Sequence, residues 1–222
     1  MTLDPIQIRV LGALIEKEIA TPENYPLSLN ALVNACNQRS SRDPVTNLTE
    51  DEVRQALHTL EDMGLTAVER SSRVAKYEHR IRTVLNLRRD ETAVLCLLFL
   101  RGPQTPGELR ARADRLYSFD GLDAVESTLG RLTAPATETG NENPAALRPL
   151  AVVLPRQPGS REARYAHLLG GPVEATVQDS SGEVRQALAA GPTLAARVAE
   201  LEAEVAGLRA AVARIEDRLA GS

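Results

Sequence analysis

The feature that most constrains the fold is one order of patterns that occurs twice along the chain: three helical patterns, then a strand, a turn and a strand. In each copy, apolar residues recur at helical spacing in three successive segments, and two short β-type runs separated by polar residues follow. Three helices followed by a β-hairpin is the plan of a winged helix-turn-helix module. The sequence therefore predicts a mainly α-helical protein with small antiparallel β-hairpins, built from two winged-helix domains in tandem.

The first copy is expected over residues 1–88. Ser28 can cap a short second helix, and Thr49 with Glu52 has the spacing of a capping box at the start of the third. Gly64 suits the end of that helix because glycine adopts a left-handed backbone without strain. The segments "LTAVER", "SSRV" and "AKYEHRI" then predict a strand, a turn and a strand.

The second copy is expected over residues 89–170. "TAVLCLLFL" predicts a helix over 92–100, and Thr105 with Glu108 forms another capping box, with proline at the first helical position. A third helix is predicted from about 120 to 132. "AVVLPRQPGSREARYAHLL" indicates a strand, a polar wing and a strand, whereas "TAPATETGNENPAALRP" has no apolar period and indicates a loop.

A third region follows, with a linker at 171–192 and a C-terminal helix at 193–220. Apolar residues recur there at alternating spacings of 4 and 3, which is a heptad pattern. Valine at most a positions and leucine at most d positions favour a parallel two-stranded coiled coil, and hence a homodimer. A helix docked on its own protomer is the alternative. The predicted dimerisation residues are Leu194, Val198, Leu201, Val205, Leu208, Val212, Ile215 and Leu219.

Composition indicates a cytoplasmic protein with aliphatic cores. The chain has no Trp and only two Phe, and no apolar run approaches the roughly 18 residues of a membrane span. The N-terminal residues mix charges at helical period and lack the layout of a signal peptide. Cys36 and Cys96 both lie in apolar helical patterns, so we expect buried, reduced thiols.

Nothing in the sequence indicates an enzyme, a cofactor or a metal centre. No glycine-rich phosphate loop follows a strand, and the three histidines are scattered, without metal-ligand spacing to cysteines or carboxylates. Glu16 and Glu18 lie two residues apart on a helix and face different ways, so we expect both to be solvated. The prediction is a non-enzymatic protein.

Duplex DNA is the predicted partner, and the predicted function is sequence-dependent binding of that duplex as a transcriptional regulator or a chromosome-associated factor. In a winged helix the third helix enters the major groove and the wing contacts the backbone. On the outward face of the first third-helix, the predicted base readers are Arg54, Gln55 and His58. Cations in the long polar turn before that helix and in the two wings are the predicted phosphate contacts: Arg39, Arg42, Arg73, Lys76, Arg156 and Arg161.

Charge leaves a second hypothesis open. The net charge is −4, although seven cations and one acid lie between Arg70 and Arg89. Acids crowd both third helices, with Glu50, Asp51 and Glu52 at the start of the first, and acids there repel phosphate. A protein-protein interaction scaffold that uses the same surfaces without binding DNA would tolerate these acids better than a repressor would.

Two long motifs resemble a known family. "LDPIQIRVLGALIEKEIATPENYPLSLNALVNACNQRSSRDPV" and "PRQPGSREARYAHLLGG", with "YEHR" between them, closely resemble the YceH family of uncharacterised bacterial proteins over residues 3–171. The resemblance implies a pair of winged-helix domains and a DNA-binding role inferred from that fold. It carries no site residues over, and because one fold hosts many functions, the role remains an expectation.

Overall fold

The computed structural model describes residues 1–70, 73–134, 149–156 and 162–171, all within a compact unit that comprises Met1–Ala175. These residues form seven α-helices and five short strands, so the described part of the chain is helical with small antiparallel sheets, as predicted. Three predictions lie outside the described residues: most of the predicted loop (135–148), Arg161 in the second hairpin, and the heptad pattern of 194–219.

The first half of the unit carries a three-stranded sheet. β3 is its middle strand and pairs antiparallel with β1 on one side and β2 on the other, with Val68 opposite Tyr77. The three helices and the hairpin occur in the predicted order, and β1 is a strand that the sequence pattern did not indicate. In chain order the elements are α1 (Pro5–Ala20), the 3-10 helix η1 (Pro22–Asn24), β1 (Leu27–Ser28), α2 (Leu29–Cys36), α3 (Glu50–Asp62), β2 (Thr66–Glu69) and β3 (Lys76–His79).

The helix ends of the first half follow the predicted caps. The Ser28 hydroxyl accepts a hydrogen bond from the backbone N–H of Ala31 at 3.3 Å. Thr49 and Glu52 form the reciprocal capping box that starts α3, and Gly64 follows the helix with φ of 70°, in the left-handed region. These hydrogen bonds confirm the predicted caps. The caps could be predicted because each is a local interaction between residues that are two or three positions apart.

The second half repeats the order with a smaller sheet. β4 pairs antiparallel with β5, and a single bridge between Gln104 and Tyr165 occupies the place that β1 has in the first half. The first long helix begins at Arg89, three residues before the expected start, and the last begins at Leu122, two residues after it. The short helix α4 (Ile81–Val84) connects the two halves, and the elements of the second half are α5 (Arg89–Arg101), α6 (Pro106–Ala113), α7 (Leu122–Thr133), β4 (Ala151–Val153) and β5 (Tyr165–His167).

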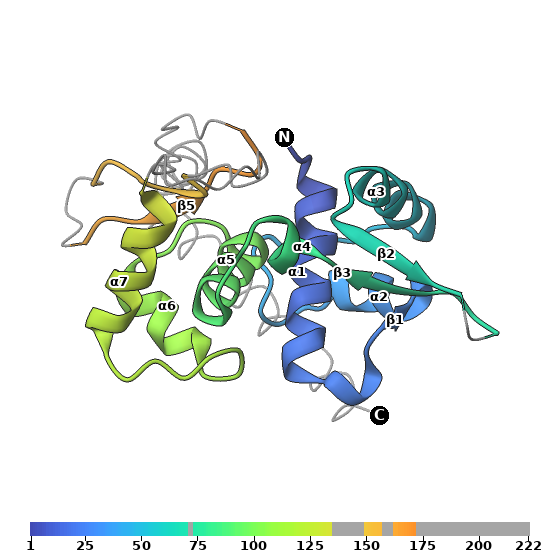
Figure 1. Cartoon of the computed structure of the whole chain (residues 1–222), viewed down its shortest axis with the longest axis horizontal. Helices are drawn as coiled ribbons and strands as arrows, with labels where there is room; N and C mark the ends of the chain where they lie inside the picture. Colours follow the sequence, from blue (N-terminus) through green and yellow to red (C-terminus); the bar gives the residue numbers. More distant parts are fainter. Residues whose placement is uncertain (71–72, 135–148, 157–161, 172–222) are drawn as a thin grey trace, which may run out of the picture. The chain divides into compact units, whose positions relative to one another are not determined.

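One apolar core joins the two halves. α1 and α5 lie side by side at the centre of Figure 1 and pack against each other. Their close approach depends on Gly12, because a methyl group there would lie only 2.8 Å from Leu100 Cδ2. The Cys96 thiol, buried in the same contact, donates to the Gly12 carbonyl oxygen at 3.4 Å. Both cysteines are buried free thiols, as predicted, and burial raises the pKa of Cys36 to about 12.

Candidate nucleic-acid interface

The long polar turn before α3 is organised by a buried arginine. Arg42 donates two hydrogen bonds to the Glu16 carboxylate, at 3.0 and 2.6 Å, and its Nε and Nη2 atoms donate to the Ala35 carbonyl oxygen at 3.1 and 2.8 Å. Its side chain has no exposed surface. The prediction that Arg42 contacts phosphate is therefore wrong, because the guanidinium faces inward and its donors are used within the protein.

The rest of the turn is tied to the elements around it. The Asn37 side chain donates to the Leu48 carbonyl at 2.8 Å and accepts from the Leu48 N–H at 2.7 Å. Arg9 of α1 donates to the Pro44 carbonyl at 2.6 Å, and the Asp43 N–H donates to the carbonyl of Leu100 at the end of α5 at 2.8 Å. The turn connects α2 to α3 and contacts both α1 and α5. Its length allows it to link the two halves of the unit. Arg39 lies exposed on it.

On α3, the three predicted base readers are exposed, but acids already contact two of them. Arg54 forms ion pairs with Glu50 and Asp51, one turn earlier on the same helix. His58 Nδ1 lies 3.4 Å from the Asp62 carboxylate. Gln55 is exposed. A phosphate or a base would have to compete with carboxylates for Arg54.

The exposed face of α3 is acidic beyond these pairs. Glu52 and Glu61 are also exposed on it. Hydrogen bonds from the backbone and then the hydroxyl of Thr49 lower the pKa of Glu52, so it carries its charge at neutral pH. Like charges repel across a solvent-exposed surface within about one Debye length, roughly 10 Å at 0.1 M salt. The helix that would read bases therefore repels the phosphates on either side of them.

The hairpin of the first half carries cations instead. Arg70 and Arg73 are exposed and Lys76 is half-buried, and in the described residues no carboxylate lies within 4.0 Å of these three side chains. Arg80 next to them pairs with Glu78 at 3.4 Å. We call the cations that lack such a partner the basic segment, which runs from the hairpin through α4 to the start of α5: Arg70, Arg73, Lys76, Arg82, Arg88 and Arg89.

In the described residues of the second hairpin the arginines are Arg156 and Arg164. Arg156, a predicted phosphate contact, is exposed just after β4. Arg164, which sequence reasoning did not select, donates to the Pro103 carbonyl at 2.9 Å and lies 3.3 Å from Glu108, so it holds β5 against the start of α6. On α7, Asp123 and Glu126 are exposed, as on the acidic α3.

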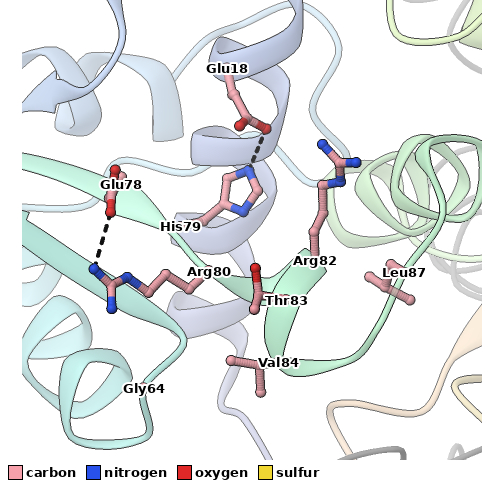
Figure 2. A pocket seen from close by; sticks show the side chains of 9 residues that line it. All are labelled: Glu18, Gly64, Glu78, His79, Arg80, Arg82, Thr83, Val84 and Leu87. Atoms are coloured by element: carbon pink, nitrogen blue, oxygen red, sulfur yellow. Dashed lines mark hydrogen bonds and ion pairs between the residues drawn. The ribbon is translucent and has the colours of Figure 1, made fainter.

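A groove beside the hairpin gathers residues that sequence reasoning treated as solvated or scattered. Figure 2 shows His79 at the end of β3 bonded to Glu18 of α1, with 2.8 Å between His79 Nε2 and the carboxylate. The hydrogen bond from His79 lowers the pKa of Glu18. Glu16 and Glu18 do face different ways, but each holds a partner, Arg42 and His79, so the expectation of two solvated carboxylates is wrong.

Sequence comparison shows which family the chain belongs to. The model of a family described as a protein of unknown function, DUF480, matches residues 3–160. The chain belongs to the DUF480 family. A UPF0502 protein of Koribacter versatilis is 53% identical over 206 residues, which is 92% of this chain and 89% of that protein. A UPF0502 protein of Chromobacterium violaceum is 48% identical over 221 residues, 99% of this chain and 93% of that protein.

Two further properties of this DUF480 chain concern its described residues alone. None of their helices is both long and apolar enough to cross a membrane. Within the same residues, no group of three or more His, Cys, Asp or Glu side chains is arranged to hold a metal ion.

Proposed function

We propose that this chain binds duplex DNA mainly through the phosphate backbone, with little discrimination of sequence, as a chromosome-associated factor or a regulator without catalytic activity. The observation that carries the proposal is the basic segment, whose hairpin cations Arg70, Arg73 and Lys76 have no carboxylate within 4.0 Å in the described residues. Cations of this kind neutralise phosphates and release counterions, which is the main source of affinity for any duplex.

The order of elements supports a tandem winged-helix architecture. Each half has three helices and then an antiparallel hairpin, and a short strand or bridge between the first two helices completes the sheet. In that architecture the hairpin is the wing, which contacts the DNA backbone or an adjacent groove. The motif "LDPIQIRVLGALIEKEIATPENYPLSLNALVNACNQRSSRDPV" lies within the matched residues 3–160, which supports treating the YceH and DUF480 families as one.

The proposed mode of binding follows from the difference between α3 and the hairpin. Because Glu50 and Asp51 hold Arg54, bidentate recognition of a guanine would require both ion pairs to be broken. Phosphate contacts fix position and orientation but carry no direct sequence information. A protein that uses its wing more than its third helix should therefore bind many duplexes with similar affinity.

The test compares two double variants of the full-length chain by fluorescence anisotropy on a random duplex. Arg73→Ala with Lys76→Ala should weaken binding by about tenfold or more at about 50 mM salt and reduce the salt slope by about 2. Arg73→Lys with Lys76→Arg keeps both charges and should bind like the wild type. Equal affinities for the two double variants would remove the hairpin from the interface.

The acidic face of α3 favours a second candidate, a scaffold that binds a basic protein surface and no DNA. Glu61→Gln with Asp62→Asn separates the two functions, because both acids are exposed and neither takes part in the α3 capping box. For a DNA-binding protein this change removes repulsion and should raise duplex affinity about twofold or more. For a scaffold, the wild type and the variant should both fail to bind DNA.

We also propose that two cytoplasmic copies associate through the C-terminal heptads. The seam of valine and leucine, from Leu194 to Leu219, supports a parallel pair. A two-fold dimer would present two wings to one duplex, a whole number of helical turns apart. Leu208→Asp puts a charge in the seam and should give a monomer by light scattering, with weaker duplex binding through lost avidity.

A further inference from the structure

Two adjoining cavities form a groove where the two halves of the unit meet. The larger has a volume of about 710 Å³ and the smaller about 390 Å³, and Glu18 and Arg82 line both. The end of β3 and α4 form one side of the larger cavity (Figure 2). Arg89 and Thr92 of α5 and the residues after α6, Leu116 and Tyr117, line the smaller. A molecule in this groove would contact both halves.

The charges in the groove do not cancel within the protein. Arg80 pairs with Glu78, and Glu18 accepts a hydrogen bond from His79. Arg82 and Arg89 have no carboxylate within 4.0 Å in the described part of the chain, and the Arg82 Nε atom is buried without a hydrogen-bond partner there. In Figure 2 the Arg82 side chain extends into the space beside His79 with no bond drawn to it. Two guanidiniums therefore face the groove against one carboxylate already in use.

His79 adds a second unsatisfied polar group to the same lining. Its side chain is only 2% exposed, and Nε2 lies 2.8 Å from the Glu18 carboxylate. Nδ1 has no hydrogen-bond partner among the described residues. Buried polar atoms in folded proteins nearly always have a partner, so two such atoms at one groove indicate a site that binds something polar.

The smaller cavity also offers an apolar surface. Ile19 of α1 lines it together with Leu116 and Tyr117. Tyr117 is 37% exposed, although its ring packs against Phe119 at a centroid distance of 4.7 Å. Ligand sites typically combine apolar walls with a few polar groups that fix orientation.

We propose that this groove binds a small organic anion, a carboxylate or a phosphate monoester carried on an apolar body. Arg82 and Arg89 pair with the anionic group, and Ile19, Leu116 and Tyr117 contact the body. Arginine suits this role because its planar fork matches the oxygens of either group. Since the lining comes from both halves, the bound anion would hold the wing-bearing half and the α5–α7 half together.

The test is an NMR titration of the full-length chain with four probes: phenyl phosphate, benzoate, inorganic phosphate and the neutral benzyl alcohol. We expect phenyl phosphate or benzoate to shift the amides near Arg82 and Arg89 with a Kd of about 1 mM or tighter. Inorganic phosphate and benzyl alcohol, which each lack one half of the recognised chemistry, should bind at least about tenfold more weakly.

Variants decide whether the groove is the site. Arg82→Gln should weaken the binding of the anionic probe by about tenfold or more, whereas the exposed Arg156→Gln should leave it unchanged. Saturation by neither organic anion at about 10 mM, or equal binding to wild type and Arg82→Gln, would overturn the proposal. The titration contains no DNA, so its outcome is independent of the proposed function. A loss of duplex affinity in Arg82→Gln as large as that in Arg73→Ala/Lys76→Ala would assign Arg82 to the duplex instead.

Discussion

His79 and His167 occupy equivalent places in the two halves but have opposite environments. Each ends the second strand of its hairpin and lies opposite the first residue of the preceding strand, Thr66 for His79 and Ala151 for His167. His79 reaches Glu18 on α1. His167 meets the ring of Phe99 on α5, edge to face, with centroids 5.0 Å apart. One repeated position is thus polar in the first half and apolar in the second.

The apolar environment of His167 changes its pKa. Burial lowers the pKa of His167 to about 4, because no carboxylate compensates the charged ring. His79, in contrast, has the Glu18 carboxylate 2.8 Å from its Nε2 atom. The repeated order of elements therefore fixes where a side chain lies, while the residue on the neighbouring helix decides what that side chain can do.

The connections between the second and third helices of each half differ in the same way. In the first half, residues 37–49 are ordered by the ion pair of Arg42 with Glu16 and by Asn37. In the second half, the shorter connection at 114–121 is held by Phe119, which is buried and packs edge to face on Tyr117. A polar network orders the first connection, and apolar contact orders the second.

The largest predicted effect on stability comes from a variant that breaks the polar network. Arg42→Ala leaves Glu16 without its partner and the Ala35 carbonyl without two donors, so we expect a loss of about 3–5 kcal/mol in the free energy of unfolding. Urea denaturation followed by circular dichroism measures it. Arg39→Ala, on the same connection but exposed, should change stability by less than about 0.5 kcal/mol. Similar losses for the two variants would mean that the network does not order the turn.

The next effect is the pH dependence of stability that His167 causes. Because the pKa of His167 is lowered to about 4 from 6.5, the unfolded state binds more protons between these values. The contribution of this residue to stability is therefore complete above pH 6.5 and falls as the pH drops toward 4, by about 3 kcal/mol.

His167→Phe removes the titrating ring and should flatten the stability curve over the same range, measured by urea midpoints at several pH values. His79→Phe serves as the comparison, because it removes the hydrogen bond to Glu18 and should lower stability at neutral pH without removing the His167 slope. An unchanged slope in His167→Phe would contradict the assignment.

The smallest effect on stability is that of adding a methyl group at a helical glycine. Its sign should differ between Gly12, at the contact between the halves, and Gly130, which is away from it. Gly12→Ala places a methyl group 2.8 Å from Leu100 Cδ2, so α1 and α5 must separate, at a cost of about 1–2 kcal/mol. Gly130→Ala on α7 meets nothing within 4 Å and should instead stabilise the helix by about 0.5–1 kcal/mol. Thermal unfolding of both variants measures the difference, and stabilisation by Gly12→Ala would contradict the close packing of α1 on α5.

Local features of the fold could be predicted from the sequence, and long-range contacts could not. The capping boxes at Thr49 and Thr105 involve residues three apart, so their spacing reveals them. Arg88 is the N-cap of α5, and its backbone N–H donates to the Glu91 carboxylate at 3.0 Å. Arginine is not a usual N-cap residue, so the sequence pattern predicts a later start for α5 than the structure has.

The candidate site depended on contacts that no periodicity encodes. Arg42 lies 26 residues from Glu16, and His79 lies 61 residues from Glu18. Nothing in the polar turn distinguishes the buried Arg42 from the exposed Arg39. The acids at the start of α3 were visible in the sequence, but their pairing with Arg54 depended on the rotamers that the helix selects.

The measurement that tests the central proposal most directly is the salt dependence of binding to a random duplex by the full-length chain. If the hairpin cations and Arg88 hold the phosphate backbone, the logarithm of the affinity should fall linearly with the logarithm of salt concentration, with a slope of about −3 to −4 for about four neutralised phosphates. Absence of binding at about 50 mM salt would contradict the proposal, because the repulsion from α3 would then outweigh the attraction of the hairpin.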